Sequence, residues 1–67
     1  MEYENIIDKY TKQIETGYQL NKAAFDNLVT ELRSVFPTTE LEKKVKEYAH
    51  PQINNTGITK FINSLYE

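Results

Sequence analysis

Few residue types in this sequence can carry catalysis, and those present form no recognisable constellation. The 67-residue chain has one histidine, His50, and no cysteine, so thiolate zinc sites, iron–sulfur clusters and thiol nucleophiles are excluded. His50 stands directly before Pro51, as at a helix end, where an imidazole can bind terminal carbonyl groups or remain in solvent. Neither Ser34 nor Ser64 lies in the glycine-flanked turn of a serine nucleophile.

Phosphate and metal chemistry also lack their usual motifs. The chain has only two glycines, Gly17 and Gly57, and they stand too far apart to form a phosphate-binding loop. Its ten carboxylates are spread along predicted helix surfaces, whereas paired hydrolytic acids need a cleft. No calcium-binding loop pattern occurs. We therefore expect no enzymatic activity, no metal and no cofactor.

Six residues of the C-terminal half could contact nucleic acid. If the last two predicted helices form a helix-turn-helix, the final one presents Thr59, Lys60 and Asn63 to phosphates and base edges. Lysines of the preceding helix could add backbone contacts; they are Lys43, Lys44 and Lys46. However, the connector over 50–55 exceeds the usual three- or four-residue turn, and the net charge is −2. A dimeric DNA-binding transcriptional regulator is therefore the alternative hypothesis.

The aromatic content offers a different kind of site. The chain has five tyrosines and three phenylalanines, and six of these eight residues fall on predicted apolar stripes. Tyr18 and Tyr66 do not, because one lies in a connector and the other at the C-terminal edge. Tyrosine is enriched in protein interfaces, so both are candidate interface residues. In the structural alternative, Tyr18 packs under the end of the first helix and Tyr66 covers the rim of the core.

The helices that carry these residues are predicted from the spacing of apolar side chains. Apolar residues at i, i+3, i+4 and i+7 are the pattern of amphipathic helices. The first stripe predicts a helix over 2–16, ended by Gly17 in a left-handed cap. The second and most hydrophobic stripe predicts a central helix over 21–36, capped by Asn21 and ended by Pro37. The stripe residues are Tyr3, Ile6, Ile7, Tyr10 and Ile14, then Ala24, Phe25, Leu28, Val29, Leu32, Val35 and Phe36.

Two shorter helices complete the prediction. A Thr-Glu-Leu-Glu capping box that starts at Thr39 predicts a helix over 39–49. The following loop carries Ile53, which we expect to plug the core, and Thr56 is the expected N-cap of a helix over 56–66. Their apolar stripes are Leu41, Val45, Tyr48 and Ala49, then Ile58, Phe61, Ile62 and Leu65.

Together these elements predict one all-α domain over 1–67, a small bundle of three to four short helices around a single core. No apolar run approaches a membrane span, and the first residues lack the regions of a signal peptide. With no cysteine, we expect a soluble, cytoplasmic protein. A domain this small often needs an oligomer. The last helix offers surplus apolar surface at Phe61, Ile62, Leu65 and Tyr66, which predicts a homodimer.

The leading functional hypothesis is a non-catalytic protein-binding module, a small bacterial or phage accessory protein that acts as a regulator, inhibitor or immunity-type factor. Small size, absent catalytic motifs, an acidic balance and surplus aromatic residues favour it. The expected partner is another protein rather than nucleic acid or a membrane. Charge discriminates the hypotheses, because DNA binding requires a concentrated basic face around Lys43, Lys44, Lys46 and Lys60.

Overall fold

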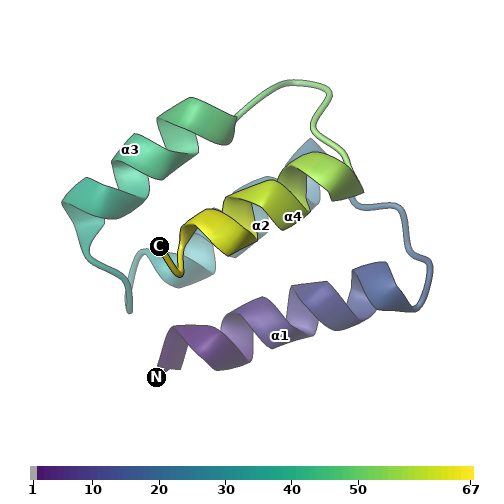
Figure 1. Cartoon of the computed structure of the whole chain (residues 1–67), viewed down its shortest axis with the longest axis horizontal. Coiled ribbons are helices and arrows are strands. Elements are labelled where there is room, and N and C mark those ends of the chain that lie inside the picture. The colour runs from purple at the N-terminus through teal and green to yellow at the C-terminus, as the bar shows by residue number, and fades with distance from the viewer. Residues whose placement is uncertain (1) are drawn as a thin grey trace.

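The computed structural model describes residues 2–67, which form four α-helices and no strand. The helices are α1 (Glu2–Glu15), α2 (Lys22–Leu32), α3 (Thr38–Tyr48) and α4 (Asn55–Ser64). Successive helices run in opposite directions, with α4 in front of α2 and with α1 and α3 on either side (Figure 1). α4 packs on both α3 and α1, and α1 also packs on α2. The predicted all-α bundle is confirmed.

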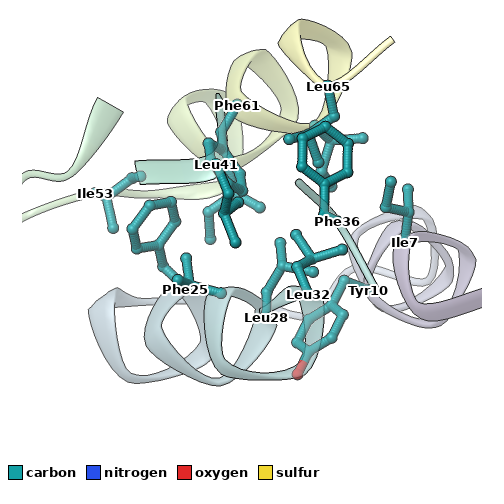
Figure 2. Close-up of a cluster of buried hydrophobic side chains, with 13 residues drawn as sticks. Ile7, Tyr10, Phe25, Leu28, Leu32, Phe36, Leu41, Ile53, Phe61 and Leu65 are labelled. Atoms are coloured by element: carbon teal, nitrogen blue, oxygen red, sulfur yellow. The ribbon is translucent and has the colours of Figure 1, made fainter. Parts of the chain in front are cut away.

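α2 contributes the predicted apolar stripe to the core. Leu28 and Leu32 are fully buried, and the Phe25 ring meets the edge of the Phe61 ring of α4 with centroids 4.9 Å apart. Figure 2 shows side chains from all four helices meeting in this cluster. Its members are Ile7, Tyr10, Phe25, Leu28, Val29, Leu32, Phe36, Leu41, Ile53, Ile58, Phe61, Ile62 and Leu65.

The loop between α3 and α4 contributes one side chain to this core. Ile53 is buried, as predicted. Its close approach to α4 depends on Gly57, because a Cβ at position 57 would lie only 2.8 Å from Ile53 Cγ1. Gly57 therefore allows Ile53 to pack closely against α4. The sequence alone does not predict this packing role, since Gly57 is considered there only as part of a phosphate-binding loop.

The end of α1 has the predicted glycine cap. Gly17 has a φ of 97°, in the left-handed region that favours glycine. Its N–H donates to the Ile14 carbonyl at 3.0 Å, and the Tyr18 N–H donates to the Gln13 carbonyl, also at 3.0 Å. This pair of hydrogen bonds is the Schellman motif, which satisfies carbonyl groups that the helix leaves without partners.

Asparagine side chains cap the starts of α2 and α4. Asn21 caps α2 as predicted, since its Oδ1 accepts the backbone N–H three residues later at 3.2 Å. The predicted cap of the last helix is wrong: Asn54 Oδ1 accepts the Gly57 N–H at 3.1 Å, so α4 begins at Asn55 and Thr56 lies inside it. Three successive residues here could act as caps, and local preference did not distinguish them.

Two other boundaries differ from the prediction. α2 ends at Leu32, after which the chain forms a turn whose Phe36 N–H donates to the Leu32 carbonyl at 2.9 Å. The turn keeps Phe36 buried without continuing the helix to Pro37. The capping box at Thr39 is wrong, because α3 already begins at Thr38 and its N-cap residue, Pro37, makes no side-chain capping hydrogen bond.

Two predictions about apolar residues are also wrong. Ala49 is exposed rather than part of the α3 stripe, because it is the C-cap residue, where the backbone turns extended. The apolar surface on which the dimer prediction rests lies inside the core: Phe61, Ile62 and Leu65 are 0%, 6% and 4% exposed, and only Tyr66 faces solvent. Within residues 2–67, no helix has the length and hydrophobicity to cross a membrane.

Candidate protein interface

The two tyrosines predicted as interface residues are the large hydrophobic residues that residues 2–67 leave exposed. Tyr18 is 65% exposed, so it does not pack under the end of α1, whereas Tyr66 is 53% exposed and contacts Tyr3 at the edge of the core. Tyr18 follows the C-terminal cap of α1, whereas the Tyr66 ring lies 6.0 Å from that of Tyr3, in the first turn of α1. The two tyrosines therefore lie at opposite ends of α1 and do not contact each other.

A shallow groove runs between α1 and α4, which pack side by side in opposite directions (Figure 1). It encloses about 230 Å³. Ile14 of α1 and Ile62 of α4 form its apolar floor. Its walls are Thr11 and Glu15 on α1 and Thr59 and Asn63 on α4. A more open hollow continues the groove toward the start of α4 along Ile14, Asn55, Thr56, Thr59 and Lys60.

Asn55 joins the connector after α1 to this groove. Its Oδ1 accepts the Leu20 backbone N–H at 2.8 Å, and its Nδ2 donates to the Tyr18 carbonyl at 2.7 Å. One side-chain amide therefore satisfies two backbone groups more than thirty residues away in the sequence. The backbone of Tyr18 is thereby held beside the start of α4, at one end of the groove.

The α1 wall of the groove is acidic. Glu4, Asp8, Thr11 and Glu15 are spaced by four, three and four residues, which places them on one stripe of α1. Thr11 and Glu15 line the groove directly. At the other end, the pKa of Tyr66 is raised, mainly by partial burial and further by the nearby charges of Glu4 and Asp8. Glu15 therefore brings negative charge into the groove itself, and Asp8 continues the acidic stripe beyond Thr11.

The α4 wall is polar but nearly uncharged. Asn55, Thr56, Thr59 and Asn63 supply amide and hydroxyl groups, and Lys60 is the one cation among the residues that line the two hollows. Three residues predicted as DNA contacts, Thr59, Lys60 and Asn63, thus lie together on this exposed side of α4. They face an acidic wall, which disfavours a phosphate backbone in the groove.

The remaining predicted DNA contacts lie on α3, and one already has a partner. The Lys44 ammonium donates to the Ser64 carbonyl at 2.6 Å, at the C-terminal end of α4. A cation at this position satisfies a terminal carbonyl and complements the helix dipole. Lys44 therefore joins α3 to α4, whereas Lys43 and Lys46 are exposed on α3.

The structure does not gather these lysines into one basic face. Lys44 marks the edge of α3 that borders α4, and Glu40 and Glu47, at i−4 and i+3, share that edge. Lys46 follows Lys44 by two positions and so lies on the far side of α3. In addition, α3 and α4 run antiparallel (Figure 1), whereas the helices of a helix-turn-helix cross at about 90–120°.

The residues first considered for catalysis have structural contacts. His50 Nδ1 accepts the Gln52 N–H at 3.1 Å, within the turn after α3. Ser64 is buried, and its hydroxyl donates to the Phe61 carbonyl at 2.6 Å. No group of histidine and carboxylate side chains within residues 2–67 is arranged to hold a metal ion.

The structure contains a polar cluster between α1 and α2 that the sequence did not predict. The buried Tyr10 hydroxyl donates to Glu31 at 2.5 Å, and the Lys9 ammonium lies 2.6 Å from the other oxygen of the same carboxylate. Burial, reinforced by Glu31, raises the pKa of Tyr10 to about 12. Hydrogen bonds from Lys9 and then Tyr10 lower the pKa of Glu31. The partners are more than twenty residues apart, so no helical spacing indicates the contact.

This cluster predicts a stability that falls at both ends of the pH scale. Folding lowers the pKa of Glu31 from its unfolded value near 4.5. Glu31 therefore adds to the free energy of unfolding above pH 4.5, and this contribution is lost as the pH falls through the lower pKa of the folded state. Because folding raises the pKa of Tyr10, its contribution is present below pH 10 and is lost as the pH rises toward about 12.

Urea unfolding at a series of pH values tests both signs. In a plot of the free energy of unfolding against pH, Glu31→Gln should reduce the decrease at acid pH. Tyr10→Phe should reduce the decrease at alkaline pH. Asp26→Asn makes the same charge change on α2 at an exposed i, i+4 pair with Lys22 and should leave the decrease at acid pH unchanged. An unchanged decrease at acid pH in Glu31→Gln would contradict the assigned role of Glu31.

Comparison of the chain with protein-family models, curated proteins and solved structures finds no match. Function is therefore inferred from the surface and its chemistry. The most distinctive surface, here called the α1–α4 face, consists of the groove-lining residues with Tyr18 at one end and Tyr66 at the other.

Proposed function

We propose that this chain is a non-catalytic protein-binding module and that the α1–α4 face is its docking surface. One observation carries the proposal: an exposed tyrosine lies at each end of the α1–α4 pair, Tyr18 beside Asn55 and Tyr66 beside Tyr3, while the other large hydrophobic residues within 2–67 are buried or packed against the core. Such a module would act as a small regulator or inhibitor by covering a partner's surface. A cytoplasmic setting is in keeping with a cysteine-free chain.

The fold itself gives no reason for a tyrosine at position 18. Its side chain makes no hydrogen bond or ring contact with other described residues, whereas Tyr10 is buried and bonded to Glu31. An exposed aromatic ring loses unfavourable water contact when a partner covers it. The exposed surface of the domain is 4541 Å². An ordinary interface of about 800 Å² per partner would cover roughly a sixth of it, comparable with one face of a four-helix bundle.

Affinity capture from the cells that naturally make the protein tests this function. We expect a protein partner that is retained after nuclease treatment. Tyr18→Ala and Tyr66→Ala should each weaken its binding about tenfold or more, as for aromatic residues central to interfaces. Both side chains are exposed, so unfolding midpoints should change little. Lys43→Ala and Lys46→Ala, on exposed α3 positions, are controls that should leave capture unchanged.

DNA binding is the outcome that would overturn the proposal. It would appear as nuclease-sensitive capture and as a sequence-specific gel shift at physiological salt. In that case Lys60→Ala should abolish the shift and Asn63→Ala should relax the sequence preference. With an acidic chain that presents no single basic face, we expect no gel shift.

A further inference from the structure

We infer that the α1–α4 groove accepts an amphipathic helix of a partner protein, with apolar residues on the groove floor and lysine or arginine side chains against the α1 wall. This inference rests on the proposed function and adds the chemistry of the partner.

The shape of the groove fits a helix. Two antiparallel helices form its walls, and its floor is apolar at Ile14 and Ile62. A guest helix would place residues at i, i+3 or i+4, and i+7 on such a floor. On the α4 side the two hollows extend from Asn55 to Asn63, eight positions or roughly 12 Å. A guest helix therefore needs at least two turns to span the groove.

The charges of the wall define the guest further. Asp8 and Glu15 form no ion pair with other described residues. Three other carboxylates do form pairs: Glu31 with Lys9, Asp26 with Lys22, and Glu42 with Arg33. Glu40 and Glu47 on α3 likewise form no ion pair with other described residues, so Asp8 and Glu15 are distinguished by their place on the stripe of α1 that borders the groove.

Two other charges near the groove do not cancel this wall. Lys60 lies in the open hollow near the start of α4, on the opposite wall. Lys12 is exposed on α1 and, like Asp8, does not line either hollow; it forms no ion pair with Asp8 or Glu15. The negative charges of Glu4 and Asp8 also act on a neighbouring side chain, because both raise the pKa of Tyr66. A basic guest would therefore gain attraction on the α1 side, from Glu15 in the groove and from Asp8 beyond Thr11 on the same stripe.

The same charges disfavour the two other occupants. A second copy in a twofold arrangement would bring the same patch against itself, so the two acidic stripes would face each other. Nucleic acid would bring phosphates against those carboxylates. A basic helix is the occupant whose charge complements the wall.

The test uses the full chain, labelled with ¹⁵N, and two synthetic helical peptides of about 14 residues, roughly 21 Å long. Both peptides carry leucines on one face; one has flanking lysines and the other has glutamates in their place. We expect the lysine peptide to shift amide signals of α1 and α4 along the groove, saturably. Its binding should weaken as salt rises from about 50 to about 300 mM. The glutamate peptide should not bind.

Matched variants locate the charge effect. The double variant Asp8→Asn, Glu15→Gln should bind the lysine peptide about threefold to tenfold more weakly. The double variant Glu40→Gln, Glu47→Gln removes the same charge from exposed positions on α3 and should bind like the unmodified chain. Shift changes confined to α3, equal binding of both peptides, or equal losses in the two double variants would each overturn the inference.

A comparison with partner capture separates this inference from the proposed function. If capture depends on Tyr18 and Tyr66 but not on Asp8 and Glu15, the chain is a protein-binding module and the basic-helix inference is wrong. If no protein is captured by any variant, the proposed function itself fails.

Discussion

Replacing Leu28 with alanine should remove a large part of the stability of this domain. Leu28 of α2 is fully buried within a core that all four helices share. Such a truncation loses transfer free energy and leaves a cavity, so we expect a cost of about 2–5 kcal/mol. Typical total stabilities for a chain of this size are roughly 3–10 kcal/mol. Urea unfolding followed by circular dichroism would measure the loss as a lower midpoint.

A neighbouring residue on the same helix provides the control for Leu28→Ala. Asn27 is exposed and has no side-chain hydrogen bond with other described residues, so Asn27→Ala should change stability by less than about 0.5 kcal/mol. If Leu28→Ala has an equally small effect, α2 is not the centre of the core.

Replacing Asn55 with alanine should have the second largest effect. The change removes two hydrogen bonds and leaves the Leu20 N–H and the Tyr18 carbonyl without their partner. At about 1 kcal/mol for each bond, with an added cost for the partly buried Leu20 group, the expected loss is about 1–3 kcal/mol. Amide hydrogen exchange at Leu20 should also become faster, because its protecting acceptor is gone.

Variants of asparagine distinguish the two hydrogen bonds. Asn55→Asp keeps the acceptor for Leu20 but loses the donor for Tyr18, so its stability should fall between those of the unmodified chain and Asn55→Ala. Asn63→Ala changes an exposed asparagine of the same helix without a side-chain hydrogen bond and should cost less than about 0.5 kcal/mol. Equal stability of Asn55→Ala and Asn63→Ala would contradict the role of Asn55 in joining the connector to α4.

Asn55 also links stability to the proposed interface. It holds the backbone of Tyr18 beside the groove, so Asn55→Ala should weaken partner binding even though it leaves the tyrosine in place. Loss of a fixed backbone position adds an ordering cost when the partner binds.

The sequence by itself determined the helical class, the buried side of α2, and two caps. These features depend on short-range chemistry. Apolar spacing defines the buried side of a helix, as at Leu28 and Leu32. A glycine can adopt the left-handed backbone that ends α1, and an asparagine side chain can accept an N–H at the start of α2. Two residues outside the stripes, Tyr18 and Tyr66, were also identified as exposed candidates.

Local chemistry was insufficient where several neighbours could serve the same role. Asn54, Asn55 and Thr56 all suit an N-cap, but Asn54 takes that role while the side chain of Asn55 binds the backbone of Tyr18 and Leu20. In the same way, a proline at position 37 indicates that α2 has ended before it, but not that the chain turns after Leu32 while Phe36 stays buried. In both cases the boundary coincides with tertiary contacts that the local sequence does not define.

Only the tertiary structure decided which surface residues share a face. Lys44 looked available for DNA and instead binds the end of α4, and Glu31 binds Lys9 and Tyr10 rather than a neighbour on its own helix. The groove likewise combines an acidic stripe of α1 with a polar stripe of α4. The pattern along one helix defines which of its sides is buried, but it carries no information on the register of the helix packed beside it. That register is set by how the core side chains of all four helices fit together.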